Sequence, residues 1–411
     1  MGRPVTVALV GVGGYGEFYV DALLDEIPSE EAIIAGVVDP YAHRCNRLAD
    51  LKSRDVPFFD GLKEFYDRHT ADLVVISSPI ALHREQTCAA LENGSHVLCE
   101  KPVAATIQDV RCMMETRDRA KRNVAVGYQW SFSCAVQNLK ADIMAGRYGA
   151  AVRLKTMALW PRSASYYKRN SWAGAVKNAA GEWVLDSPVN NACAHFLHNM
   201  FYLLGDHVNR SASPVTVTAE LYKAKKIANF DTAVLRTRVA NGAEILFVTS
   251  HAVDQMRGPL FDFQFEHGSV AYDKATGQLR GHMANGECIE YGDPWTDMTR
   301  KLTDSLDAVR GQGDIVCGLE AASAHTLAVN GAHESCPAVY AFSDDALRTS
   351  AWGEGDSLTF VDGLYDDLRR CYSEGALPSE LAFPWAKTAR EVSLTSYHRF
   401  PSDSLAARWR A

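Results

Sequence analysis

A glycine-rich segment near the start of the chain has the spacing of a phosphate-binding turn. It follows an apolar strand pattern over 5–10 and opens a helical pattern, and its members are Gly11, Gly13, Gly14, Tyr15 and Gly16. In a Gly-x-Gly-x-x-Gly turn, one glycine permits the tight bend, one lets a pyrophosphate approach the backbone, and one lets helix and strand pack closely. The amino end of the helix supplies N–H groups for the phosphates. The segment therefore predicts a dinucleotide-binding site.

An acidic residue, Asp39, ends the second strand pattern and decides which dinucleotide fits. A carboxylate there accepts hydrogen bonds from the ribose hydroxyls and repels a 2′-phosphate, and Pro40 beside it has no N–H to offer a phosphate. His43 and Arg44 are close enough in sequence to be partners of such a phosphate. We expect NAD as the cofactor, with NADP as the less favoured alternative.

Lys101 follows the strand pattern His96–Cys99, at the edge of a parallel sheet that faces the cofactor. Hydride transfer from an alcohol carbon needs a base for the hydroxyl proton. A lysine serves as this base where burial and a neighbouring positive charge lower its pKa. The alternative is an ordinary surface lysine in a strand-to-helix turn.

A second set of polar residues lies in the segment 186–198. Asn191 and His195 are spaced i, i+4, so both lie on one face of a helix and can reach one substrate. His198 is either a substrate contact or a structural histidine. A metal site is not expected, because no His-Glu-x-x-His motif is present and the spacing places no third ligand.

An aromatic and cationic loop, 160–172, follows the first strand pattern of the second half of the chain. Aromatic rings pack on the C–H faces of sugars, and cationic and amide groups bind the hydroxyls. The same residue types are common in oligomer interfaces, so that alternative stays open. The substrate-binding candidates here are Trp160, Tyr167, Arg169 and Trp172.

Taken together, these motifs resemble those of the Gfo/Idh/MocA family of oxidoreductases. The resemblance covers about residues 5–340 and rests on the glycine segment, Ser77-Ser78-Pro79 with His83, Glu100-Lys101-Pro102, Gly127-Tyr128-Gln129, and His195 in a helix that Gly205 closes. It implies a two-domain, nicotinamide-dependent dehydrogenase with a sugar or polyol substrate. It also implies Lys101 and His195 as catalytic residues. The further cofactor contacts that it implies are Ser77, Ser78, Pro79, His83, Glu100, Lys101 and Gln129.

Position 191 departs from the family pattern. The family carries Asp-x-x-x-His, and counting back from Gly205 puts Asn191 at the aspartate position. Asparagine hydrogen-bonds a sugar hydroxyl but holds no negative charge and takes no proton. His195 therefore lacks a carboxylate partner unless Asp186 folds back toward it. We expect Asn191 to bind substrate rather than relay a proton.

The elements around these residues predict two domains. Over 1–129, apolar strand patterns alternate with helical ones, typical of an α/β Rossmann domain with a doubly wound parallel sheet. Its strand patterns are Val5–Val10, Ile33–Asp39, Leu73–Ser77, His96–Cys99 and Val124–Gly127, and its helical patterns are Tyr15–Glu26, Tyr41–Arg54, Ala81–Asn93 and Thr106–Arg122.

Over 130–411 the pattern predicts an α+β domain with a large, mostly antiparallel sheet and a C-terminal helical tail from about 346. Asn241-Gly242 predicts a hairpin between two of the strands. Helices on one side alone would leave an apolar face, so we expect a homo-oligomer, a dimer or tetramer. The strand patterns are Arg153–Leu159, Val215–Leu221, Thr232–Val239, Glu244–Val248, Phe261–Glu266 and Ser269–Tyr272, and the helical patterns are Asn191–Leu204, Pro294–Arg310, Leu319–Glu334 and Gly363–Glu374.

The composition narrows the class of protein. The chain has 411 residues and a formal charge of -8, which argues against broad binding to nucleic acid or an anionic membrane. It has no apolar run long enough to span a bilayer and no secretory signal pattern. Its ten cysteines are scattered without a Cys-x-x-Cys pair. A cytoplasmic protein is expected.

Three functions fit these observations. The first is an NAD-dependent oxidoreductase acting on a secondary hydroxyl of a sugar, glycoside or cyclitol. The second is an enzyme of the same family that oxidises a ring hydroxyl transiently during glycoside cleavage or epimerisation, with no net NADH. The third is a non-catalytic dinucleotide-binding sensor, which Lys101 and His195 at family positions argue against.

Overall fold

The computed structural model describes residues 3–410, which form two compact units. The first unit consists of Met1–Ala104, Gln108–Phe132 and Asp297–Ala322, and the second of Ala105–Ile107, Ser133–Thr296 and Ser323–Ala411. The boundary expected between residues 129 and 130 falls close to Phe132. The segment Asp297–Ala322, which the sequence placed in the second domain, belongs to the first unit instead, because its helix packs on strands of that sheet.

The first unit is built on a parallel sheet of order β3-β2-β1-β4-β5-β6. Its strands are β1 (Val5–Val10), β2 (Ala32–Val38), β3 (Phe58–Phe59), β4 (Leu73–Ile76), β5 (His96–Cys99) and β6 (Val124–Val126). The central strands are buried along almost their whole length, as expected when helices cover both faces. The predicted doubly wound sheet is confirmed.

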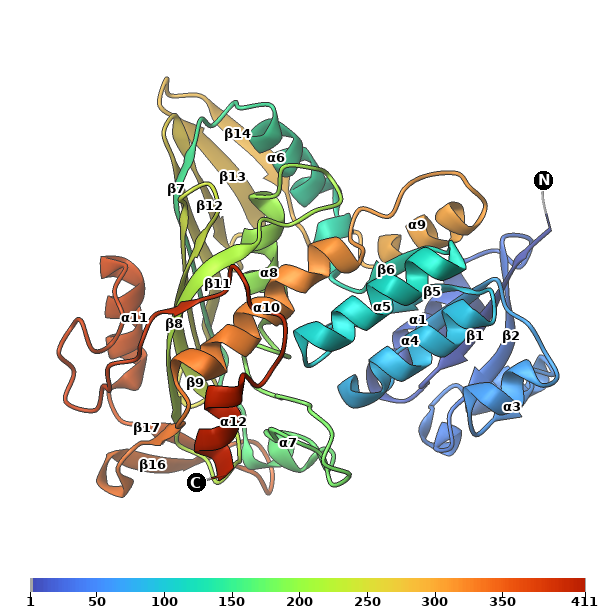
Figure 1. Cartoon of the computed structure of the whole chain (residues 1–411), viewed down its shortest axis with the longest axis horizontal. Helices are drawn as coiled ribbons and strands as arrows, with labels where there is room; N and C mark the ends of the chain where they lie inside the picture. The colour runs from blue at the N-terminus through green and yellow to red at the C-terminus, as the bar shows by residue number, and fades with distance from the viewer. Residues whose placement is uncertain (1–2, 411) are drawn as a thin grey trace. The chain divides into compact units, whose positions relative to one another are not determined.

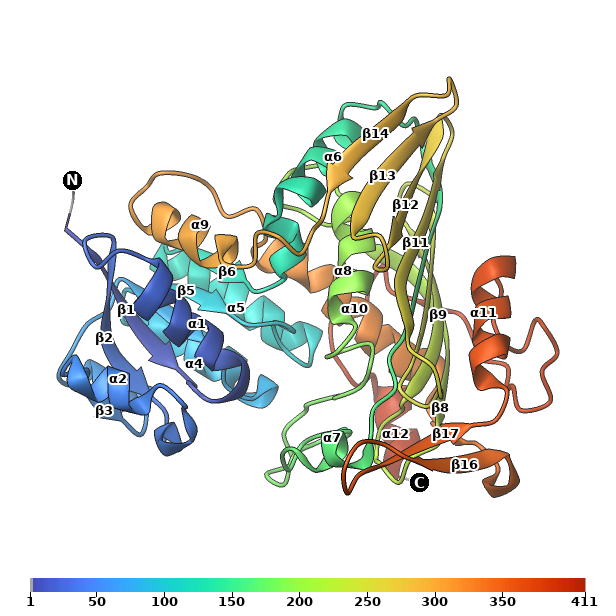
Figure 2. The same ribbon diagram turned by 180° about the vertical axis from the view of Figure 1, so that it is seen from behind.

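Helices cover both faces of this sheet. Those of the first unit are α1 (Glu17–Asp21), which continues as a π-helical turn, α2 (Leu48–Ser53), α3 (Leu62–Tyr66), α4 (His83–Glu92), α5 (Ile107–Ala120) and α9 (Arg300–Val309). Figures 1 and 2 show α4 and α5 on one face and α1 and α9 on the other. Helix α9 contacts β4 and β5 there.

One predicted helix of the first unit, Tyr41–Arg54, is wrong. The structure has a 3₁₀ turn at Ala42–Arg44, an extended Cys45, and then α2. The Glu17 carboxylate accepts hydrogen bonds from the backbone N–H and the side-chain amide of Asn46, at 2.9 and 2.8 Å. These bonds hold the chain in a break that the amphipathic pattern did not reveal.

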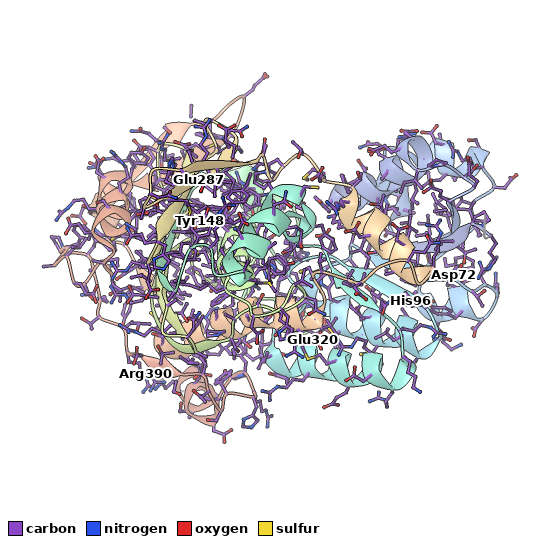
Figure 3. The ribbon with its side chains drawn as sticks, turned by 90° about the horizontal axis from the view of Figure 1, so that it is seen from above. Asp72, His96, Tyr148, Glu287, Glu320 and Arg390 are labelled. Carbon is purple, nitrogen blue, oxygen red and sulfur yellow. The ribbon has the colours of Figure 1, made fainter. Side chains whose placement is uncertain are left out.

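The two edges of the parallel sheet differ in their residues. Its carboxyl edge carries the glycine segment, Asp39, Ser77 and Glu100, because parallel strands all end there. Its amino edge carries Asp72 and His96, which Figure 3 shows close together. The His96 N–H donates to the Asp72 carbonyl oxygen at 2.8 Å.

The second unit is built on a ten-stranded sheet of order β14-β13-β12-β11-β7-β10-β9-β8-β15, with β18 also paired to β8. The strands are β7 (Ala151–Leu159), β8 (Pro214–Lys223), β9 (Thr232–Val239), β10 (Glu244–Ser250), β11 (Arg257–Phe265), β12 (Gly268–Asp273), β13 (Gln278–Met283), β14 (Cys288–Gly292), β15 (Tyr340–Ala341) and β18 (Val392–Ser393). Apart from β7–β10 and β15–β8, neighbouring strands are antiparallel. The mostly antiparallel sheet and the hairpin at Gly242, with φ of +89°, are confirmed.

Helices of the second unit pack on both faces of its sheet. They are α6 (Cys134–Met144), α7 (Ala164–Lys168), α8 (Ala194–Leu203), α10 (Leu319–Ser335), α11 (Leu364–Glu374) and α12 (Asp403–Arg410), and a small hairpin of β16 (Leu347–Ala351) and β17 (Ser357–Val361) lies nearby. Figures 1 and 2 show α8 and α10 on one face and α11 on the other. The predicted one-sided arrangement is therefore wrong.

The second face is covered by the chain itself. Met157 and Leu159 of β7 and Val248 of β10 form one buried cluster with Leu364 and Leu368 of α11. The apolar surface that motivated the expectation of a homo-oligomer is thus largely buried within one chain. A homo-oligomer stays a prediction, without that support.

Candidate functional site

The glycine turn between β1 and α1 has the geometry that a dinucleotide needs. A Cβ at Gly16 would lie 2.1 Å from the carbonyl oxygen of Gly11, so only glycine lets the helix pack this closely on the strand. Gly11 has φ of +79°, and its Cβ would meet the backbone nitrogen of Ser78 at 3.0 Å. At Gly13 and Gly14 nothing lies within 4 Å. The turn is therefore crowded at Gly11 and Gly16 and open at Gly13 and Gly14, where a pyrophosphate can approach the backbone.

The Asp39 carboxylate is fixed beside this turn. One oxygen accepts the backbone N–H of Val12 at 2.9 Å and the other accepts that of Tyr41 at 2.8 Å. Each carboxylate oxygen has a second lone pair, which suits the two hydroxyls of an adenosine ribose. Arg44, the possible partner of a 2′-phosphate, lies over the Tyr41 ring at 4.7 Å.

The loops after β4 and β5 are tied together by His83. Its two ring nitrogens lie 2.9 Å from the carbonyl oxygens of Pro102 and Ser78. Burial lowers the pKa of this histidine, against the two carbonyl oxygens, which favour the protonated ring. The geometry gives His83 a role in holding the two loops, and its predicted contact with a cofactor stays a prediction.

Glu100 is the centre of a buried polar network in the first unit. Its carboxylate lies 2.5 Å from the Lys301 Nζ and 2.6 Å from the Tyr19 hydroxyl. The backbone N–H of Lys101 donates to its second oxygen at 3.0 Å. The side chains of Glu100 and Lys301 are 7% and 0% exposed. The network therefore fixes the backbone of Lys101 through a fully desolvated ion pair.

Aromatic rings surround the ammonium group of Lys301. It lies 4.5 to 5.1 Å from the ring centres of Tyr15, Phe18 and Tyr19, positions that stabilise a cation. It also donates to the Tyr15 hydroxyl, which in turn donates to Gln129. Two predicted cofactor residues, Tyr15 and Gln129, thus share one network with Glu100.

The pKa values in this network follow from its charges. Burial raises the pKa of Glu100, but Lys301 and Lys101 outweigh that effect and the net pKa lies below the usual value. Burial lowers the pKa of Lys301, against the attraction of Glu100. The negative charge next to Lys101 is therefore balanced by a second lysine.

Sequence reasoning missed Lys301. Its partner Glu100 lies 201 residues earlier in the chain. The sequence predicted the helix that carries Lys301 but assigned no role to this residue. The available signal was a lysine on the apolar stripe of α9, among the buried Leu302, Leu306 and Ala308. A charged residue at such a position needs a buried partner.

In the second unit, Asn191 and Asp186 are bonded to each other. The Asn191 amide nitrogen donates to one Asp186 oxygen at 2.7 Å. The other oxygen accepts the Gly174 N–H at 2.6 Å and lies 3.5 Å from the Arg169 guanidinium. Asp186 therefore supplies a carboxylate directly beside position 191, where the family aspartate is replaced. His195 is 9% exposed, in the first turn of α8.

His198 is buried in the second unit. It is 1% exposed and stacks on Tyr202, with ring centres 5.7 Å apart. Burial, and then the charges of His325 and Lys140, lower its pKa well below the usual value. Burial agrees with the structural alternative for His198, and the predicted substrate contact stays a prediction.

The loop 160–172 gathers its rings and cations around His251. The Tyr167 hydroxyl lies 3.0 Å from the His251 Nδ1, and the Arg169 guanidinium lies 3.8 Å from the centre of the Tyr166 ring and 5.3 Å from that of Trp172. Trp160 packs edge-on against Phe196, which follows His195 on α8, at 5.3 Å. The rings and cations predicted to bind substrate from this loop thus lie near one another, and Arg169 connects them to Asp186 and Asn191.

The structure gathers the predicted residues into two sets. The cofactor set and Lys101 belong to the first unit, and the substrate set and His195 to the second. Within residues 3–410 no group of three or more His, Cys, Asp or Glu side chains is placed to hold a metal ion. Over the same range no helix is long and apolar enough to cross a bilayer.

Comparison with protein families gives a match for the first unit. Residues 5–128 match the model of the Gfo/Idh/MocA oxidoreductases, described as an oxidoreductase family with an NAD-binding Rossmann fold. The matched residues include the glycine turn, Asp39 and the Glu100-Lys101 pair.

Individual proteins match over different lengths. Glucose-6-phosphate 3-dehydrogenase of Bacillus subtilis is 22% identical over 246 residues, 59% of this chain and 67% of that protein. Inositol 2-dehydrogenase of Acidothermus cellulolyticus is 29% identical over 148 residues, but this covers only 36% of this chain and 42% of that protein.

Among solved structures, the WlbA dehydrogenase of Bordetella pertussis, in complex with NADH and UDP-GlcNAcA, superposes with a TM-score of 0.65. It is 22% identical, and the match covers 80% of this chain and 95% of that one. At this identity the likeness establishes the shared fold alone, and it extends over both units.

Proposed function

Because the chain belongs to the Gfo/Idh/MocA family of oxidoreductases, we propose that it transfers a hydride between a nicotinamide cofactor and a secondary hydroxyl of a sugar, glycoside or cyclitol. The relatives named above for glucose 6-phosphate and inositol support this substrate class. The observation that carries the proposal is the glycine turn, closed by Gly11 and Gly16 and open at Gly13 and Gly14, with the Asp39 carboxylate fixed beside it.

The cofactor, when bound, accepts or returns the hydride. In the proposed arrangement the backbone at Gly13 and Gly14 holds its phosphates and Asp39 holds its ribose, which favours NAD over NADP. Lys101 takes the hydroxyl proton at its Nζ. The ion pair of Glu100 with Lys301 supports this role, because it neutralises an anion that would otherwise keep Lys101 protonated.

His195 and Asn191 are proposed to orient the substrate hydroxyl. The amide nitrogen of Asn191 donates to Asp186, which fixes the Asn191 side chain, and an amide group of this kind hydrogen-bonds a substrate hydroxyl without taking its proton. The Asp186 carboxylate also lies 3.5 Å from the Arg169 guanidinium. The family carries a carboxylate at position 191 itself, whereas here the carboxylate is that of Asp186, which is hydrogen-bonded to Asn191.

Two further proposals concern the state of the protein in the cell. No disulfide joins any of its ten cysteines in the described part of the chain, which agrees with a cytoplasmic location. Homo-oligomerisation is retained as a proposal that sedimentation at micromolar concentration tests. A single 45.2 kDa species would contradict it.

The test is a panel of sugars, cyclitols and glycosides supplied with NAD, scored for NADH absorbance and for product by chromatography. We expect NADH and a ketone from at least one compound, and neither from the Lys101→Met variant. Turnover of a glycoside with no net NADH would favour the alternative of transient ring oxidation. Tight NAD binding with no turnover of any compound would contradict an enzymatic function.

A further inference from the structure

The loop that follows β7 is cationic in an acidic protein. The whole chain has a formal charge of -8, yet residues 160–181 contain no Asp or Glu. The cations of this loop are Arg162, Lys168, Arg169 and Lys177. A local field of opposite sign to the rest of a protein attracts ligands of opposite charge.

Two neighbouring loops bring further lysines to the same place. The Lys225 Nζ, from the connection between β8 and β9, lies 5.7 Å from the Tyr167 ring centre. The Lys274 Nζ, after β12, lies 5.3 Å from the Trp160 ring centre. A backbone hydrogen bond of 2.9 Å from Asn229 to Gly174 joins the loops directly. The cations therefore form one cluster.

Some of these charges have partners within the protein. Arg169 lies 3.5 Å from the Asp186 carboxylate, whose side chain is 3% exposed. The Lys225 Nζ donates to the carbonyl oxygens of His251 and Thr359, at 2.9 and 3.0 Å. These two cations support the local structure, and the substrate contact predicted for Arg169 stays a prediction.

Arg162 differs from them. Among residues 3–410 it forms no ion pair; one terminal nitrogen donates to the Pro161 carbonyl oxygen at 3.5 Å, and its Nε is buried without a hydrogen-bond partner. Its guanidinium lies 5.0 Å from the Tyr166 ring centre and 5.6 Å from that of Trp160, so aromatic faces fix its plane. A half-buried cation without a negatively charged partner is unfavourable. An anion supplied from outside would complete this arrangement.

The group next to Arg162 offers it no negative charge. The backbone N–H of Arg162 donates to His251, which is 1% exposed and whose Nε2 has no partner among the described residues. Burial, and then the cations Arg162, Lys225 and Arg169, hold the pKa of His251 well below its usual value. His251 therefore adds no charge to the cluster, in which the Asp186 carboxylate faces Arg169 and the Asp356 carboxylate accepts hydrogen bonds from Ser165.

We propose that the sugar this chain acts on carries a carboxylate or phosphate group, and that Arg162 binds it. The inference rests on the proposed function and names the class of its substrate. A planar guanidinium binds the oxygens of either anion with two parallel hydrogen bonds. Trp160, between Arg162 and Phe196 of α8, connects this anion site to the helix that carries His195.

The experiment measures dissociation constants on the NAD-saturated protein by calorimetry, with matched ligands. The probes are glucose, glucuronate and glucose 6-phosphate, and the galactose series with the same three groups. The variants are Arg162→Met and Arg162→Lys. The matched control is Arg369→Met on α11, because Arg369 also lies over a tyrosine ring, that of Tyr365 at 5.6 Å. Thermal denaturation checks that each variant is folded.

We expect one anionic probe to bind at least about 10-fold more tightly than its neutral parent, and Arg162→Met to abolish this preference with a loss of roughly 10- to 100-fold. Arg162→Lys should keep part of the preference, and Arg369→Met all of it. Whichever of glucuronate and glucose 6-phosphate binds more tightly identifies the anionic group of the substrate as a carboxylate or a phosphate. Equal binding of neutral and anionic probes in both series, or an unchanged preference in Arg162→Met, would overturn the inference.

The same samples separate this inference from the proposed function. NADH formed from neutral sugars without any preference for the anions would leave the oxidoreductase function standing and refute the anion site. Anion binding that depends on Arg162, without NADH or altered product from any probe, would support the site and count against the oxidoreductase function.

Discussion

Replacing Lys301 with methionine tests whether the buried ion pair with Glu100 supports the first unit. The two charged atoms lie 2.5 Å apart, and neither side chain is more than 7% exposed. Removing one partner of a buried pair costs about 3–5 kcal/mol, because it leaves the other charge uncompensated. The Tyr19 hydroxyl and the Lys101 N–H still donate to the carboxylate. We therefore expect the lower end, a loss of about 3 kcal/mol in the free energy of unfolding.

The assay is urea denaturation of the wild type, Lys301→Met, Glu100→Gln, and the double variant Lys301→Met with Glu100→Gln. The double variant should lose about 2 kcal/mol less free energy of unfolding than the sum of the losses in the two single variants. The control is Lys63→Met, whose pair with Asp67 is 89% and 59% exposed and is worth about 0–1 kcal/mol. A cost of Lys301→Met no greater than that of Lys63→Met would refute the reasoning.

The same variant has a kinetic consequence that a purely structural role would not produce. Without Lys301 the Glu100 carboxylate is left unbalanced beside Lys101. The unbalanced Glu100 carboxylate favours the protonated form of Lys101, and the loss of Lys301 removes a repulsive positive charge. Both effects raise the pKa of Lys101. Since a base must be neutral to accept a proton, the rate of NADH formation should reach its plateau at higher pH. An unchanged pH–rate profile would show that Lys101 is not the base.

The remaining predictions concern single side chains. Lys101→Met should lower kcat by about 10²–10⁴ while NAD still binds, and more than His195→Asn does; a nearly normal Lys101→Met beside an inactive His195→Asn would reverse the two roles. Asp39→Ala should raise kcat/KM with NADP relative to NAD, and an unchanged ratio would mean that Arg44 or His43 already decides it. Asn191→Asp should move the pH optimum upward if position 191 lies beside His195, and change KM alone if it only binds a hydroxyl. Burial raises the pKa of Asp72, but its hydrogen bonds from Arg3 and Thr6 outweigh this effect and leave the pKa at about 2. Because this folded-state pKa is lower than that of the unfolded chain, the stabilisation is present above about pH 4 and is lost as the pH falls toward 2. Asp72→Asn should therefore remove that part of the acid dependence of the urea midpoint.

The first unit could be predicted closely because its chemistry is local. Gly11 to Gly16 lie within one turn, and the residues at the ends of β2 and β5 must meet at one sheet edge. The strand patterns, and the positions of Asp39 and Lys101 at the ends of those strands, were enough to place both residues at this edge. The break at Cys45 could not be predicted, because it depends on Glu17, which a different helix supplies.

The second unit was predicted less well because its decisive contacts join distant segments. The apolar alternation of β7 and β10 indicates which side chains are buried but not what buries them. Leu364 and Leu368 perform that role from α11, roughly 200 residues further along the chain than β7. Without those contacts, a second copy of the chain was the only visible cover for the sheet.

Lys301 and Arg162 show how polar residues can be recognised once burial is known. Both are cations removed from bulk water, and the difference between them is the presence of a partner. Lys301 meets Glu100 and three aromatic rings, so its charge is balanced inside the protein and serves to set the charge state of a neighbour. Arg162 contacts aromatic rings, the Pro161 carbonyl oxygen and His251, and it forms no ion pair in the described chain. Because a half-buried charge is stable only when something balances it, the first arrangement indicates support of a reacting group, and the second indicates a ligand that brings its own negative charge.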